Sequence, residues 1–248
     1  MLFDVGVLIF TECKVPNNDV LVYFYAFKTY IKLSMTNKKS LFIVIEGLDG
    51  SGKSSASKEL AAALDPLSKG SVKLTYEPNN DMCGGLFIRE VLTKKIPHDA
   101  PSVLPLAYAT NRLDHCHRLI RPWLEGEGHI VISDRYYLSS LVYQSRPDFP
   151  FEKIMLYNEY AIKPDVIFFI NVDSKVCYER MKIRNQPEEL FEANLDESRQ
   201  KYLNAIAFLR TSRDENIIEI DGSGTISEVA EKIQVELYKI APNLTPSV

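Results

Sequence analysis

The chain has 248 residues, of which 46% are hydrophobic and 25% are charged, and its formal net charge at pH 7 is −4. This length suffices for one α/β domain with a substantial core, and the slightly negative charge argues against a general nucleic-acid-binding protein. The four cysteines are scattered and form no CxxC pair. That pattern favours a protein of the reducing cytoplasm over a small secreted fold held by disulfides.

Residues 1–40 are an N-terminal extension that precedes the first predicted strand. Its two apolar runs, residues 5–10 and 20–27, are far shorter than the ~20 residues needed to span a bilayer, so no membrane partner is expected. The extension contains no arginine and no basic region before its first apolar run, which argues against a transit or signal peptide. Two interpretations stay open: translation begins at Met35, or the extension is a genuine surface addition.

A phosphate-binding loop is predicted after the first apolar strand. Residues 41–45 are apolar and rich in β-branched side chains, as in a buried parallel strand, and residues 54–64 have the composition of a helix. Between them, glycines allow the backbone N–H groups to point at a phosphate chain, and the helix N-terminus favours its negative charge. Lys53 is expected to reach the β- and γ-phosphates, and the Ser54 hydroxyl is expected to bind Mg²⁺. The residues predicted to bind a nucleoside triphosphate are Gly47, Leu48, Asp49, Gly50, Ser51, Gly52, Lys53, Ser54 and Ser55.

Strands and helices then alternate through residues 41–240, which predicts a single α/β domain. The further strands are expected at residues 72–76, 130–133, 166–172 and 217–220. The predicted fold is therefore that of P-loop NTPases, a five-stranded parallel sheet with helices on both faces, followed by a tail at residues 241–248. Ligands of such sheets gather at the carboxyl ends of the strands, where Asp49, Glu77 and Asp134 fall.

Residues 130–144 carry the second cluster of polar groups. Asp134 follows a buried strand directly and is placed to hold Mg²⁺ or its water ligands. Arg135 offers a planar fork for a phosphate other than the one in the loop, although an Asp–Arg pair can also simply cap a strand. The segment from Ser139 to Gln144 adds hydroxyls, an aromatic ring and an amide within one and a half helical turns. Recognition of a base and its sugar requires such groups.

Together these segments resemble bacterial thymidylate kinases over nearly all of residues 41–240. The resemblance rests on FIVIEGLDGSGKSS at residues 42–55, Asn111-Arg112, IRPWL at residues 120–124 and DRYYLSSLVYQ at residues 134–144. It implies phosphoryl transfer from ATP to dTMP with Mg²⁺, giving ADP and dTDP, by a homodimeric enzyme.

The resemblance also assigns roles to individual residues. It implies that Arg112 and Arg135 clamp the dTMP phosphate, that Tyr108 stacks on the thymine, that Ser140 and Gln144 meet the base edge, and that Tyr143 packs against the sugar. By itself, a tyrosine at this position would more often be a core aromatic residue. The implied dTMP-binding residues are Glu77, Tyr108, Arg112, Arg135, Ser140, Tyr143 and Gln144.

Catalysis is implied to depend on Lys53, Asp49, Arg135, Arg180 and Arg184. Gly50 stands where some relatives carry an arginine, so the catalytic arginines are expected in a lid at about residues 180–192. The alternative interpretation of this basic segment is a solvated helix end.

Two segments depart from the family pattern. Residues 76–80 are Tyr-Glu-Pro-Asn-Asn where the family commonly has Arg-Glu-Pro-Gly-Gly, and residues 189–192 lack the usual Asp-Arg pair. Both departures concern the acceptor side. They leave two alternatives open: a kinase of another deoxynucleotide or deoxynucleoside, and a nucleotide-binding relative with a decayed acceptor site. A GTP-dependent switch protein would need an Asn-Lys-x-Asp motif, which the sequence lacks.

Overall fold

The computed structural model describes residues 39–67, 71–96, 102–184 and 194–244. Three predicted segments therefore lie wholly or largely outside the described residues: the extension at residues 1–40, the end of the lid at residues 185–192, and the last four residues of the tail.

Five parallel strands form one sheet, and this confirms the predicted fold class. The strand order is β2-β3-β1-β4-β5. The strands are β1 Leu41–Gly47, β2 Val72–Tyr76, β3 Ile130–Asp134, β4 Val166–Asn171 and β5 Ile217–Asp221. Their ends differ from the predicted ends by at most two residues.

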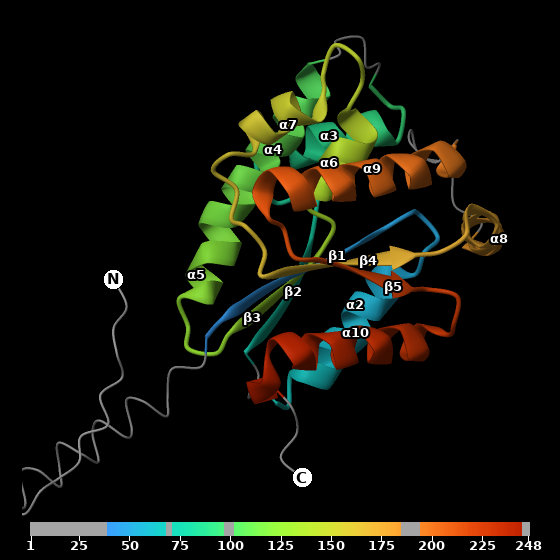
Figure 1. Ribbon diagram of the computed structural model, residues 1–248. Helices are drawn as coiled ribbons and strands as arrows, with labels where there is room; N and C mark the ends of the chain where they lie inside the picture. The colour runs from blue at the N-terminus through green and yellow to red at the C-terminus, as the bar shows by residue number, and fades with distance from the viewer. Residues whose placement is uncertain (1–38, 68–70, 97–101, 185–193, 245–248) are drawn as a thin grey trace, which may run out of the picture. The chain divides into compact units, whose positions relative to one another are not determined.

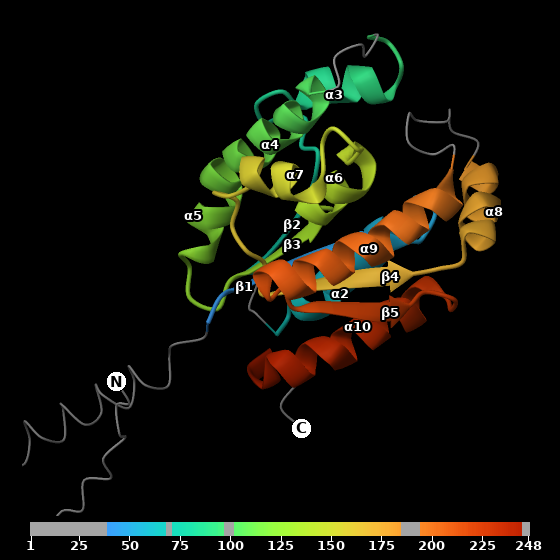
Figure 2. The ribbon, with the colours of Figure 1, turned by 45° about the horizontal axis from the view of Figure 1, so that its top comes forward.

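Helices cover both faces of this sheet (Figure 1). Helices α2 and α10 lie on one face, and α4, α6, α7 and α9 lie on the other. Helix α8 stands at the carboxyl end of β4, at the edge of the sheet (Figure 2). The helices are α2 Lys53–Leu64, α3 Gly85–Leu92, α4 Val103–His115, α5 Arg121–Leu124, α6 Tyr137–Gln144, α7 Phe151–Tyr157, α8 Ser174–Arg184, α9 Leu195–Arg213 and α10 Ile226–Ile240.

The central strands provide the middle of the core. Every residue of β1 is buried, and the first five residues of β4 are buried as well. Near-continuous apolar runs of this kind are expected for parallel strands packed on both faces. One of the buried residues is Glu46, whose carboxylate has no exposed surface.

The helical segment that begins with α4 is divided in three. Helix α4 continues into a π-helical stretch, Cys116–Ile120, and then into the short α5. At the other end of the chain, Pro242–Leu244 forms a 3-10 turn in which Leu244 is buried. The chain thus stays packed through residue 244, although the sequence suggested a tail from residue 241. None of the helices in the described segments is long and apolar enough to cross a membrane.

Candidate active site

The phosphate-binding loop connects β1 to α2 and needs glycine at two positions. Gly50 and Gly52 have φ angles of +83° and +91°, a region that other residues rarely adopt. A Cβ atom on Gly50 would lie only 2.5 Å from the carbonyl oxygen of Cys177 in α8. The loop therefore has no room for a side chain at position 50, because α8 packs directly against it.

Lys53, the first residue of α2, is held in this loop. Its side chain is buried, and Nζ lies 3.2 Å from the Leu48 carbonyl oxygen and 3.0 Å from Asp49 Oδ1. The same Asp49 oxygen accepts a hydrogen bond from Arg135 Nη2. Asp49 thus brings together the cation expected on the donor phosphates and the cation expected on the acceptor phosphate.

The position of Asp49 between two cations predicts a pH-dependent stability. Burial alone would raise the pKa of Asp49, but the charges of Arg135 and Lys53 outweigh it and hold this pKa well below its ordinary value of 3.8. A carboxyl group with a depressed folded-state pKa stabilises the fold above its unfolded-state pKa, and this stability is lost as the pH falls. Asp49→Asn should therefore make the free energy of unfolding fall less steeply with acidification. Urea unfolding at several values from about pH 6 to about pH 3 measures this slope, and equal slopes for variant and wild type would contradict the expectation.

The two predicted metal-binding residues meet where the start of α2 faces the carboxyl end of β3. Ser54 Oγ, at the start of α2, donates a hydrogen bond to Asp134 Oδ2 at the end of β3. The other carboxylate oxygen, Asp134 Oδ1, is buried and has no hydrogen-bond partner among the residues that the structure describes. A buried carboxylate oxygen without a partner beside a serine hydroxyl fits the oxygen ligands that Mg²⁺ prefers.

Arg135 adopts a left-handed backbone conformation, with φ of +72°. Its N–H donates to the Ile45 carbonyl oxygen at 2.9 Å, and the guanidinium lies 5.3 Å from the centre of the Tyr143 ring. Nη1 also donates to Ser139 Oγ at 3.0 Å. The acidic partner of Arg135 is Asp49 of the phosphate-binding loop, so it does not merely form a local Asp–Arg cap at the end of β3.

A cavity of about 530 Å³ opens between the phosphate-binding loop and helices α3, α4 and α6. Helix α6 contributes Tyr143 and Gln144, and burial raises the pKa of Tyr143 to about 12. Gln144 Oε1 is buried and has no hydrogen-bond partner within the described part of the chain. The cavity is lined by the side chains Asp49, Lys53, Ser54, Tyr76, Glu77, Arg89, Tyr108, Arg112, Asp134, Arg135, Ser139, Tyr143 and Gln144, among others.

Arg112 lies at the buried side of this cavity, with 1% of its surface exposed. Its guanidinium donates to Glu77 Oε2 at 2.7 Å, Asn158 Oδ1 at 2.6 Å and Ser140 Oγ at 3.1 Å. The second oxygen of Glu77 lies 3.0 Å from Nδ1 of the buried His115. Glu77 thus holds Arg112 beside Ser140, the residue predicted at the base edge.

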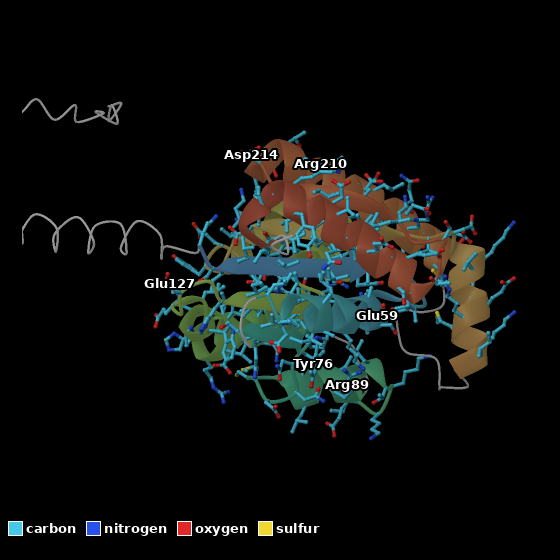
Figure 3. The ribbon with its side chains drawn as sticks, turned by 90° about the horizontal axis from the view of Figure 1, so that it is seen from below. Glu59, Tyr76, Arg89, Glu127, Arg210 and Asp214 are labelled. Atoms are coloured by element: carbon cyan, nitrogen blue, oxygen red, sulfur yellow. The ribbon has the colours of Figure 1, made fainter. Side chains whose placement is uncertain are left out.

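The altered loop after Glu77 is held by α4. Asn111 Nδ2 donates to the Asn79 carbonyl oxygen at 2.8 Å, and its Oδ1 accepts from Asn79 N at 2.9 Å. Asn79 Oδ1 in turn accepts from Asp81 N at 3.0 Å. The side chain of Asn111 thus satisfies both backbone groups of Asn79. Tyr76, at the position where the sequence resemblance implied an arginine, lines the cavity together with Arg89 of α3 (both labelled in Figure 3).

The structure brings further residues to the site that the sequence patterns did not single out. Arg89 belongs to an ordinary amphipathic helix, so nothing in its local pattern marks it. Glu46 could have been noticed, because a carboxylate in an otherwise apolar strand must have partners. Tyr202 of α9 comes from a distant part of the chain, and only the fold places its hydroxyl beside Arg135, at 3.3 Å.

Arg180 of α8 lies on the side of the phosphate-binding loop that faces away from the first cavity. Nη1 donates to the Ser51 carbonyl oxygen at 3.2 Å, and Nη2 lies 3.4 Å from the Gly224 carbonyl oxygen. A second cavity of about 510 Å³ is bounded by the loop, Arg180 and the segment between β5 and α10. Arg184 is the last residue of α8, but its side chain lies outside the described residues.

The strand order and the phosphate-binding loop, together with the cations Arg112 and Arg135 in the adjoining cavity, define a P-loop nucleotide kinase. A family model described as thymidylate kinase matches residues 45–233. A probable thymidylate kinase of Methanocaldococcus jannaschii is 34% identical over 207 residues, which cover 83% of this chain and 97% of that protein. A thymidylate kinase of Ureaplasma parvum is 34% identical over 213 residues, covering 82% and 91% of the two chains. The chain belongs to the thymidylate kinase family.

Proposed function

We propose that this protein transfers the γ-phosphoryl group of ATP to dTMP, producing ADP and dTDP. Membership of the thymidylate kinase family supports this activity. The observation that carries the proposal is the convergence of Lys53 and Arg135 on one oxygen of Asp49. This contact places the cation of the donor loop next to a cation of the acceptor cavity, as transfer between two bound phosphates requires.

On the donor side, the triphosphate chain is proposed to lie along the loop, with Lys53 on its terminal phosphates. The adenosine is proposed to occupy the second cavity, between Arg180 and the start of α10. That cavity adjoins the backbone of Gly50, Ser51 and Gly52, so a nucleotide there would continue directly into the phosphate-binding loop.

On the acceptor side, the arrangement of side chains suggests how dTMP is oriented. Arg112 and Gln144 line the cavity and are proposed to face the polar edge of the base. Ser140 is buried and does not line the cavity, and it holds the Arg112 guanidinium through a hydrogen bond. The phosphate is proposed to lie at Arg135, with Arg89 as a further cation lining the same cavity. This assignment moves Arg112 from the phosphate, where the sequence resemblance put it, to the base.

Tyr108 and Tyr143 complete the proposed acceptor site. Tyr108 precedes Arg112 by one helical turn and lines the cavity, and its ring is proposed to stack on the base. Tyr143 lies under the Arg135 guanidinium, where its ring would contact the sugar. An apolar wall of this kind discriminates only partly against a ribose hydroxyl.

The chemistry requires positioning and charge stabilisation and needs no covalent intermediate. An oxygen of the acceptor phosphate is already nucleophilic at neutral pH, so no strong general base is expected. Lys53 and Arg135 stabilise the charge that spreads over the transferring group. Arg180, and Arg184 as part of the proposed lid, are expected to add positive charge from the donor side and to help exclude water.

Ser54 and Asp134 are proposed to hold Mg²⁺, directly or through water. The ion would neutralise charge on the donor phosphates when it is bound. Asp134→Asn is expected to raise the Mg²⁺ concentration for half-maximal turnover roughly tenfold, because a charged ligand is replaced by a neutral one. The measurement is a Mg²⁺ titration of both turnover and ADP-dependent thermal stabilisation. Asp148→Asn is the matched control, since Asp148 is exposed and pairs only with Arg146 in the described part of the chain. Unchanged Mg²⁺ dependence would argue against the assignment.

The activity itself is tested by coupled ADP release with ATP, Mg²⁺ and a panel of dTMP, dUMP, dCMP, dGMP, dAMP and thymidine. Selective turnover of dTMP is expected. Selective turnover of another acceptor would keep the reaction and reassign the groups at the base edge. ATP binding without turnover of any acceptor would favour a relative whose acceptor site has decayed.

A cytoplasmic location and a homodimeric state also remain proposals. The cytoplasmic location is supported by Cys83, Cys116 and Cys177, which form no disulfide in the described part of the chain. Assembly through helices that flank the sheet is supported by exposed apolar side chains on α3 and α4, namely Leu86, Val103 and Leu106.

A further inference from the structure

The N-terminus of helix α6 is capped by a carboxylate from another part of the chain. None of its own side chains caps its N-terminus. Instead, Glu46 Oε1 accepts hydrogen bonds from Tyr136 N at 2.8 Å and from Ser139 N at 3.1 Å. The second oxygen, Oε2, accepts from Ser139 Oγ at 2.7 Å. Glu46 directly precedes Gly47 of the phosphate-binding loop, so one residue joins the donor loop to the helix that recognises the acceptor.

Tyr202 completes this connection from α9. Its hydroxyl oxygen lies 3.1 Å from both Glu46 Oε2 and the Gly47 carbonyl oxygen, and it can donate its one hydrogen to either. The same oxygen accepts from Arg135 Nη1 at 3.3 Å. The Tyr202 ring is fully buried and stacks on Phe169 of β4, with ring centres 5.0 Å apart. The hydroxyl is therefore held in one place by a rigid strand.

We propose that Glu46 and Tyr202 are positioning residues that fix Arg135 and helix α6 relative to the phosphate-binding loop, and so set the separation of the two reacting phosphates. This inference rests on the proposed function. Neither residue lines the acceptor cavity, so both act through the groups they hold. Phosphoryl transfer depends strongly on this separation, because a displacement of about 1 Å can lower the rate roughly a hundredfold.

Energetic considerations favour a positioning role over a purely structural one. A fully buried carboxylate is expensive to desolvate, and burial raises the pKa of Glu46. An apolar residue of similar volume would serve packing at least as well. In addition, Arg135 keeps a left-handed backbone, a strained conformation that persists only when its surroundings hold it. Glu46 provides this restraint by binding the next N–H, that of Tyr136.

The test compares Tyr202→Phe with Tyr137→Phe. Tyr137 is the matched control, because it is also fully buried and donates to a buried carboxylate, Glu215 Oε1, at 2.7 Å. It lines neither of the cavities described above. Both variants should lose similar thermal stability. Tyr202→Phe alone is expected to lower kcat/KM for dTMP roughly tenfold or more, while the KM for ATP changes by less than about twofold.

Glu46→Gln provides a second variant and a coupling measurement. The amide would place N–H groups against the donors of Ser139 and Tyr202, so a larger loss of kcat/KM for dTMP is expected. The double variant Glu46→Gln/Tyr202→Phe should be little worse than Glu46→Gln alone, because the two residues act as one unit. Should Glu46→Gln fold poorly, Tyr202→Phe still decides the question, because it keeps the packed ring.

Three outcomes would overturn the proposal. Equal kinetic constants for Tyr202→Phe, Tyr137→Phe and the wild type would show a structural role only. A KM for ATP that rises as much as the KM for dTMP in Tyr202→Phe, with kcat unchanged, would show general damage to the site. An inactive wild type would refute the proposed function, and the positioning role with it, whereas an active wild type with an unaffected Tyr202→Phe variant would refute the positioning role alone.

Discussion

Replacing Lys53 by alanine is expected to lower kcat roughly a thousandfold or more, while the fold survives. Lys53 is the cation of the phosphate-binding loop, and the charge that builds on the transferring group would lose its nearest protein partner. Asp49 keeps Arg135 as a counter-charge in the variant, so folding should not depend on Lys53. Single-turnover phosphoryl transfer measures the effect, and circular dichroism with thermal unfolding checks the fold.

Lys201→Ala serves as the control for this experiment. Lys201 lies on α9 and forms an exposed ion pair with Glu197 at 2.7 Å, an interaction that contributes little to stability. Its removal should leave turnover unchanged. Near-normal turnover of the Lys53→Ala variant would contradict the assignment of the phosphate-binding loop.

Replacing Arg135 by glutamine should lower kcat/KM for dTMP roughly a hundred- to a thousandfold, with ATP binding retained. The guanidinium is the cation of the acceptor cavity that lies closest to the donor loop, through its contact with Asp49. Glutamine can neither carry the charge nor form two parallel hydrogen bonds to a phosphate. Steady-state kinetics in dTMP, together with a separate measurement of ATP affinity, distinguishes the two substrates.

Arg118→Gln is the corresponding control, because Arg118 is exposed on the helical stretch after α4 and pairs with Asp114 at 3.1 Å. An equal loss of affinity for ATP and dTMP in the Arg135→Gln variant would contradict the assignment of Arg135 to the acceptor. An unchanged kcat/KM for dTMP would exclude any role of Arg135 in transfer.

The fold could be predicted because its central strands are locally consistent. In β1 and β4, apolar runs of strand length directly precede polar turns, and a parallel sheet buries such runs on both faces. The second strand, Val72–Tyr76, was predicted with its observed bounds. The π-helical stretch Cys116–Ile120 could not be predicted, since a widened helical turn depends on packing and not on hydrophobic periodicity.

The site could be predicted where neighbouring residues in the sequence carry it. The glycine-rich loop and the Asp134-Arg135 pair are local motifs, and the structure brings them together at Asp49. Side-chain contacts between segments far apart in the sequence could not be predicted. The contact of Glu77 with Arg112 and the hydroxyl of Tyr202 beside Arg135 arise only when strands and helices pack. The role of each of these residues in binding or catalysis stays a prediction until the variants are measured.

The capping of α6 by Glu46, a residue of β1, also has a consequence for how the protein folds. A helix of eight residues is marginal on its own, and this one has no local side chain to satisfy its first N–H groups. We therefore expect α6 to become helical only after β1 has docked beside β3 and has brought Glu46 to it. The surface that recognises the acceptor would then form in the same cooperative step as the loop that binds the donor, and a partly folded chain would have neither.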